Sequence, residues 1–125
     1  MSLSTDTDAA RTTAPDGHSE GILSLPERLS LFHGGALQGA EFAWRLTGPA
    51  ELPVVLVMGG ISASRKVFTE EGDRGGWWDA VVGPGRALDS RRLRILGIDY
   101  LGGSGASTGP AAGAAFPSLS SHDQA

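Results

Sequence analysis

The chain has 125 residues, of which 40% are hydrophobic, and a formal net charge of −4. This length is enough for one small domain with its own core, and the scattered basic residues exclude the clustered positive face of a nucleic-acid-binding protein. The absence of cysteine excludes disulfides, thiolate metal sites and a cysteine nucleophile from this chain.

The first segment, residues 1–22, is polar and without periodic pattern. It predicts a disordered tail ahead of a folded part at residues 23–125. The tail lacks the apolar segment of a secretory signal, and no apolar run in the chain approaches the roughly 20 residues of a membrane span. We therefore expect a cytoplasmic protein whose partners include neither membrane nor nucleic acid.

An antiparallel hairpin is the first element predicted in the folded part. Leu29, Leu31 and Phe32 indicate a short strand, and the glycines within 33–35 indicate a turn. Residues 41–46 then alternate aromatic with polar or small side chains, which is typical of a strand with one buried face. The two strands are expected to pair with each other.

Residues 54–58 form a continuous apolar run, which predicts a strand buried on both faces, as in a parallel sheet. Residues 94–99 are a second candidate for such a buried strand. Between them the sequence predicts a long loop over residues 59–76 and a short helix over residues 77–82. Glycine and proline at residues 83–85 would stop this helix.

The end of the chain predicts a second loop and the start of a helix. Residues 100–118 are rich in glycine and proline, and Ser120 or Ser121 could cap a helix that continues to Ala125. A helix of one turn is not stable alone, because nucleation costs more than one hydrogen bond returns. The sequence therefore indicates a truncated chain.

Gly59 and Gly60 are the most distinctive local feature, because they follow a predicted buried strand directly. A chain that leaves a strand through two glycines can expose consecutive backbone N–H groups, and such donors stabilise the oxyanion formed in acyl transfer. An ordinary tight exit from a strand would use the same residues, so the motif alone leaves both interpretations open.

A second motif, Gly105-Ala106-Ser107-Thr108-Gly109, matches the G-x-S-x-G pattern of a nucleophile elbow. An elbow requires a buried strand that runs into the serine and a helix that leaves it at once. The preceding Leu101-Gly102-Gly103-Ser104 cannot form a core strand, and Pro110 follows the motif. We therefore expect Ser107 to lie in a structural loop.

The remaining candidate groups point to no metal or dinucleotide site. His18, His33 and His122 lack the spacing of metal ligands. Asp99 ends a predicted strand, but no G-x-G-x-x-G motif follows the earlier strand to support nucleotide binding. Trp77 and Trp78 could line a ligand pocket or simply cover the edge of a sheet.

Taken in chain order, the motifs of residues 28–125 resemble one family, the homoserine O-acyltransferases. No single motif is specific to that family, whereas the ordered set is. The motifs that carry the resemblance are Gly34-Gly35-Ala36-Leu37, Gly59-Gly60-Ile61-Ser62, Gly76-Trp77-Trp78, Val82-Gly83-Pro84-Gly85, Leu101-Gly102-Gly103 and Ser107-Thr108-Gly109-Pro110.

The resemblance implies the fold and the position of the site. The fold would be α/β, the N-terminal part of an α/β-hydrolase fold in which a hairpin precedes a mostly parallel sheet. Ile61 and Gly60 would form the oxyanion hole, and Ser62, Trp77 and Trp78 would line the substrate pocket. The family's nucleophilic serine, aspartate and histidine would lie beyond this chain, so the chain alone is expected to be inactive.

The resemblance also implies the reaction. The whole protein would transfer an acyl group from acetyl-CoA or succinyl-CoA to L-homoserine in methionine biosynthesis, with no bound cofactor and no metal, and it could form a homodimer. Serine acyltransferases share the same architecture, so the acceptor stays open. The alternatives are an esterase or other hydrolase of this fold, and a non-catalytic binding module.

Overall fold

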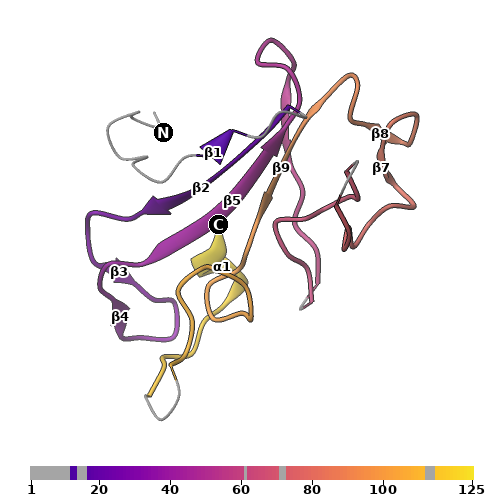
Figure 1. The fold of residues 1–125 in the computed structure, drawn as a ribbon. Helices are drawn as coiled ribbons and strands as arrows, with labels where there is room; N and C mark the ends of the chain where they lie inside the picture. Colours follow the sequence, from indigo (N-terminus) through magenta and orange to yellow (C-terminus); the bar gives the residue numbers. More distant parts are fainter. Residues whose placement is uncertain (1–11, 14–16, 61, 71–72, 112–114) are drawn as a thin grey trace.

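The computed structural model describes residues 12–13, 17–60, 62–70, 73–111 and 115–125. A five-stranded sheet in the order β1-β2-β5-β9-β6 forms its centre (Figure 1). The first three pairs in this order are antiparallel, and β9 and β6 are parallel. The strands span β1 Thr12–Thr13, β2 His18–Ser24, β5 Glu41–Thr47, β6 Val54–Leu56 and β9 Arg94–Ile98.

The long antiparallel pair of the sheet joins β2 to β5, from His18 opposite Thr47 to Ser24 opposite Glu41. The strand expected over residues 41–46 is therefore present, but the partner predicted for it is wrong. A further correction concerns the tail, because the strand begins at His18 and residues 18–22 are ordered in the sheet. The rest of the expected tail lies outside the described residues, apart from β1 and Gly17.

A small separate hairpin stands where the larger one was predicted. Its strands are β3 Leu29–Ser30 and β4 Ala36–Leu37, which pair with each other. Gly34 and Gly35 make the turn with φ angles of 92° and 78°, a backbone region that favours glycine. The short hairpin is an excursion between β2 and β5, so β5 is free to pair with the longer strand.

The parallel pair confirms the two apolar strands that the sequence predicts. Val54, Val55 and Leu56 lie opposite Arg94, Ile95 and Leu96. The strand β9 is flanked on both sides, whereas β6 is the last strand of the sheet. Burial on both faces is wrong for β6 in the described structure, because Val54, Leu56 and Met58 are 51%, 49% and 40% exposed.

Two apolar clusters pack against the sheet and its hairpin. One lies between β6, β9 and the segment after β6, and its buried members are Val57, Val67, Phe68, Val82 and Ile95. The other lies between the β3–β4 hairpin and the C-terminal segment, and its buried members are Leu31, Leu37, Ala40 and Leu101. The segment after β6 contributes Val67 and Phe68 to the first cluster. The segment after β9 contributes Leu101 to the second.

The helix predicted over residues 77–82 is wrong. The chain makes a single turn there, closed by a hydrogen bond of 3.0 Å from the Val82 N–H to the Trp78 carbonyl. It then enters β7 Val82–Gly83, which pairs with β8 Leu88–Asp89. Val82 is 1% exposed, and its burial in the core fixes the end of this turn. The segment before it is too short to offset the free-energy cost of helix nucleation.

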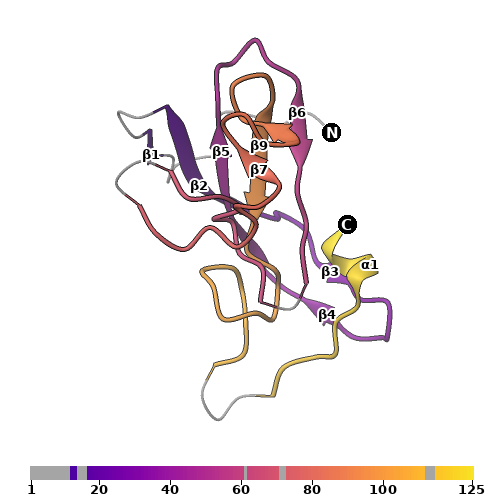
Figure 2. The ribbon, with the colours of Figure 1, turned by 90° about the vertical axis from the view of Figure 1, so that its right-hand side faces the viewer.

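The C-terminal helix forms as the sequence predicts. Helix α1 spans Ser121–Gln124, and Ser120 caps it in a capping box with Asp123. The helix lies beside the β3–β4 hairpin (Figure 2), where Asp123 accepts a hydrogen bond of 2.9 Å from the Phe32 N–H. Gln124 binds both the N–H and the carbonyl of Leu101. These tertiary contacts stabilise a helix that would not form alone.

Candidate functional site

Two glycine-containing loops leave the sheet at the carboxyl ends of the parallel strands. The first follows β6 and comprises residues 59–60 and 62–65; we refer to it as the β6 loop. The second comprises residues 99–109 and is the β9 loop. Because β6 and β9 are parallel neighbours, both loops begin at the same edge of the sheet. Ligands of α/β proteins commonly bind outside this edge.

The β6 loop is tight at Gly59 and open at Gly60. A Cβ atom on Gly59 would lie 2.4 Å from the Trp77 ring and 2.8 Å from the Cβ of Ala63, so no side chain fits there. A Cβ atom on Gly60 would have no neighbour within 4 Å. Gly60 is exposed, and among the described residues its N–H meets no acceptor. That N–H is available to a ligand.

The other predicted site residues divide between the loop and its surroundings. Ile61 lies outside the described residues, so its role as an oxyanion donor stays a prediction. Ser62 is exposed beside Gly60. Trp77 packs on the loop, and its indole Nε1 donates a hydrogen bond of 2.8 Å to the Ser64 carbonyl. Trp78 stacks on Trp77 at 5.6 Å between ring centroids and is 39% exposed.

Tyr100 is a loop contact that the sequence reasoning did not find. Its hydroxyl donates a hydrogen bond of 2.7 Å to the carbonyl of Gly59. Its place just after a buried strand was the available signal. The pairing with Gly59, however, depends on how β9 lies beside β6, which no local pattern reports.

Asp99 connects the two loops. Its side chain accepts backbone N–H bonds of 2.8 Å from both Arg65 and Ala106, and it pairs with the Arg65 guanidinium at 2.5 Å. Burial alone would raise the pKa of Asp99, which is 1% exposed, but these donors outweigh it and lower the pKa. Asp99 is therefore held ionised as an anchor between the loops.

Ser107 uses its hydroxyl within the β9 loop. The Oγ atom accepts a hydrogen bond of 2.9 Å from the Ala43 N–H and donates a short one to the Asp99 carbonyl. The residue is 7% exposed, and neither a strand nor a helix adjoins it in sequence. The strand–turn–helix setting of a nucleophile elbow is absent at Ser107, as the sequence predicts.

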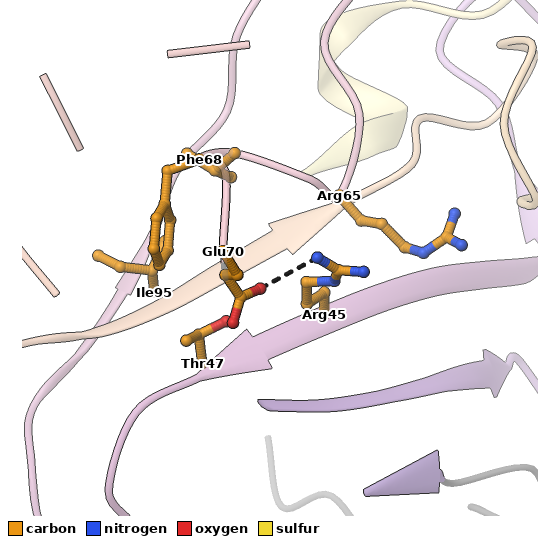
Figure 3. A pocket seen from close by; sticks show the side chains of 7 residues that line it. Arg45, Thr47, Arg65, Phe68, Glu70 and Ile95 are labelled. Carbon is orange, nitrogen blue, oxygen red and sulfur yellow. Dashed lines mark hydrogen bonds and ion pairs between the residues drawn. The ribbon is translucent and has the colours of Figure 1, made fainter. Parts of the chain in front are cut away.

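Buried charge gathers around Arg45, beyond the β6 loop (Figure 3). Arg45 is 6% exposed and binds Glu20, Glu70 and Asp73 at 2.7, 3.0 and 2.8 Å. The hydrogen bond from Arg45, together with the Arg74 N–H, lowers the pKa of Asp73 to about 2. No local sequence pattern indicates this cluster, because its members come from three separate segments.

The hollow beside this cluster is too tight to hold a ligand, and its charges pair with one another. Its walls are Arg45, Thr47, Arg65, Val67, Phe68, Glu70 and Ile95. In the described part of the chain, no group of three or more His, Cys, Asp or Glu side chains could hold a metal ion. No helix there has the length and apolar character needed to cross a membrane. The exposed β6 loop remains the candidate site.

No protein-family model matches the chain. The serine O-succinyltransferase of Frateuria aurantia is 37% identical over 93 residues, which are 70% of this chain and 25% of that protein. The homoserine O-succinyltransferase of Xanthomonas campestris pv. campestris is 38% identical over 112 residues, 85% of this chain and 28% of that protein. The chain thus spans about a quarter of the length of the curated relatives it matches.

Solved structures show the same arrangement of strands. The crystal structure of esterase E22 matches with a TM-score of 0.66 and 20% identity, over 86% of this chain and 34% of that one. The homoserine O-acetyltransferase from Bacillus anthracis matches with a TM-score of 0.53 and 20% identity, over 66% of this chain and 23% of that one. At this identity the likeness shows the fold alone.

Proposed function

We propose, on the premise that this chain belongs to the homoserine O-acyltransferase family of α/β-hydrolase-fold proteins, that it is the N-terminal part of an acyl-CoA-dependent O-acyltransferase. The acceptor would be L-homoserine, with L-serine as the closest alternative, and the acyl donor succinyl-CoA or acetyl-CoA. The observation that carries the proposal is the exposed Gly60 in the loop after β6, whose N–H meets no acceptor among the described residues, in a chain whose relatives are named as such acyltransferases.

The role of this chain would be to stabilise negative charge during acyl transfer. A serine elsewhere in the whole protein attacks the thioester carbonyl, and CoA leaves as the thiol. The homoserine hydroxyl then attacks the acyl-serine and regenerates the serine. Each step passes through a tetrahedral oxyanion, and the N–H groups of Gly60 and Ile61 would donate to it.

The walls of the pocket would come from residues that surround the β6 loop. Ser62 is exposed next to the proposed donor, and Trp77 covers one side of the loop. Trp78 is exposed and presents the outer face of the stacked pair. We place the enzyme in the cytoplasm, in methionine biosynthesis, without metal or bound cofactor; the whole protein could form a homodimer.

An esterase is the second candidate, because the match to esterase E22 has a TM-score of 0.66 and covers 86% of this chain. The two activities share the acyl-enzyme and differ in the acyl donor, an ester or a CoA thioester, and in what accepts the acyl group. An acyltransferase passes it to the amino-acid hydroxyl, whereas an esterase passes it to water. The products therefore separate the candidates.

The test uses the full-length protein with succinyl-CoA or acetyl-CoA and L-homoserine. We expect CoA release that depends on homoserine, with the O-acylhomoserine ester identified by mass spectrometry. The 125-residue chain alone is the control, and it should release no CoA above the buffer rate. Homoserine-independent hydrolysis without ester product would favour the esterase and contradict the proposal.

A further inference from the structure

The geometry points to Tyr100 as a positioning residue that sets the direction of the Gly60 N–H, an inference that rests on the proposed acyltransferase function. The Tyr100 hydroxyl donates a hydrogen bond of 2.7 Å to the Gly59 carbonyl. That carbonyl and the Gly60 N–H belong to one peptide group. Tyr100 would act on the oxyanion through this peptide without touching the substrate.

The planarity of the peptide transmits the effect. In a trans peptide the C=O and N–H bonds lie in one plane and point in opposite directions. Once the carbonyl of Gly59 is held by Tyr100, the N–H of Gly60 must point the other way. Gly60 is exposed, and among the described residues no acceptor occupies this N–H. The hydrogen bond to the Gly59 carbonyl therefore fixes the direction of the Gly60 N–H, which stays available to a ligand.

Two successive glycines make such an anchor necessary. Glycine populates a wider range of backbone conformations than any other residue, so the Gly59–Gly60 peptide has little local reason to keep one orientation. Trp77 limits the position of Gly59 by packing its ring against the Cα atom. Ring packing restricts translation, whereas a directed hydrogen bond also restricts rotation of the peptide. Oxyanion donors are effective because their orientation is set before the reaction begins.

Two consecutive residues at the start of the β9 loop hold the two ends of the β6 loop. Tyr100 binds the Gly59 carbonyl at the start, and Asp99 binds the Arg65 N–H at the end. The tasks differ, however. Asp99 also holds the β9 loop through Ala106 and is needed for packing. Tyr100 is only partly buried, so removal of its hydroxyl should spare the fold and affect the peptide it binds.

The experiment compares Tyr100→Phe with the wild type in the full-length protein. The rate of acyl-enzyme formation should fall about tenfold. This is less than the roughly 10²–10³-fold loss expected when an oxyanion donor is removed, because the Gly60 N–H is still present and only its orientation is less fixed. The KM for acyl-CoA should change by less than about twofold, because the ground state does not need the donor. Thr108→Val is the matched control. It removes one side-chain hydrogen bond, to the Glu41 N–H, from the other loop.

A second readout separates positioning from general structural damage. An alkyl boronic acid forms a tetrahedral adduct with a catalytic serine and places an oxygen where the oxyanion would lie. We expect its inhibition constant to rise about tenfold in Tyr100→Phe, in step with the rate loss, while the thermal unfolding midpoint and CoA affinity stay unchanged. Equal rates and equal boronate inhibition in both proteins would overturn the role of Tyr100. A wild type that releases no CoA from any acyl-CoA would overturn the proposed function, and this inference with it.

Discussion

The two loops at the carboxyl edge of the parallel strands look alike in sequence and differ in how their polar groups are used. The β6 loop contains two glycines and the β9 loop four, and both match a motif associated with acyl transfer. In the β6 loop Gly60 is exposed and its N–H meets no acceptor among the described residues. In the β9 loop Ser107 is buried and its hydroxyl both donates and accepts. The availability of a group, more than its motif, distinguishes a site from a structural turn.

The difference arises from what packs on each loop. The β9 loop lies against β5, where the Ser107 Oγ satisfies the N–H of Ala43, and Thr108 satisfies that of Glu41. The β6 loop is held by hydrogen bonds with Trp77, Tyr100 and Asp99. Gly60 nevertheless stays exposed, so the loop combines anchoring with an open donor, as the binding of a developing charge requires.

The largest effect should follow from removing the anchor that the two loops share. Asp99→Ala leaves two backbone N–H groups without their acceptor and the Arg65 guanidinium with only its 3.4 Å contact to Glu20. We expect the free energy of unfolding to fall by about 3 kcal/mol, as for other broken buried pairs. Urea unfolding followed by tryptophan fluorescence measures it. Asp89→Ala removes an ion pair with Arg91 and two backbone N–H bonds, from Gly85 and Arg91, at an exposed position. It should cost much less, and an equal loss would show that Asp99 is no special anchor.

A glycine pair tests the asymmetry within the β6 loop. Gly59→Ala forces a Cβ atom against Trp77, and overpacking of this kind costs about 2–3 kcal/mol. Gly60→Ala meets open space and should change stability by less than about 0.5 kcal/mol. Thermal unfolding of the two variants is the measurement. If both destabilise equally, the loop is not packed on Trp77 as described.

Replacement of the β9-loop serine tests whether that loop is only structural. Ser107→Ala leaves the buried Ala43 N–H and Asp99 carbonyl without partners, which should cost about 1–2 kcal/mol of stability. Acyl-enzyme formation in the full-length protein should persist, as read by intact-protein mass spectrometry after mixing with acyl-CoA. Loss of the acyl adduct in this variant alone would identify Ser107 as the nucleophile and remove the contrast between the loops.

The smallest effect is a pH-dependent change in stability at the Arg45 cluster, outside the β6 loop. Arg45 and the Arg74 N–H lower the pKa of Asp73 from 3.8 to about 2. A lowered native pKa contributes stability that is present above about pH 4 and is lost as the pH falls towards 2. Because Asp73 is partly exposed, Asp73→Asn should cost only about 1 kcal/mol at neutral pH. The difference from wild type should vanish near pH 2, and a constant difference would contradict this assignment.

Some features could be predicted because they depend on neighbours in the chain. The strand predicted at residues 54–58 became β6, since an uninterrupted apolar run between Pro53 and Gly59 has few other uses. The strand predicted at residues 94–99 became β9, in which Ile95, Leu96 and Ile98 are apolar. The cap at Ser120 followed from the preference of serine for that position. Ser107 could be rejected as an elbow because Leu101-Gly102-Gly103-Ser104 cannot form a core strand.

Other features depended on pairings between distant segments, which local patterns do not report. The partner of β5 is β2, and the two strands pair along seven residues. The strand β3 pairs with β4 instead, along two residues. The Arg45 cluster and the contact of Tyr100 with Gly59 join segments separated by 25 to 41 positions. The sequence by itself determined the strands β5, β6 and β9, the cap at Ser120 and the glycine exit after β6. Only the tertiary structure decided which exit stays open, because that depends on which distant donors and acceptors pack against each loop.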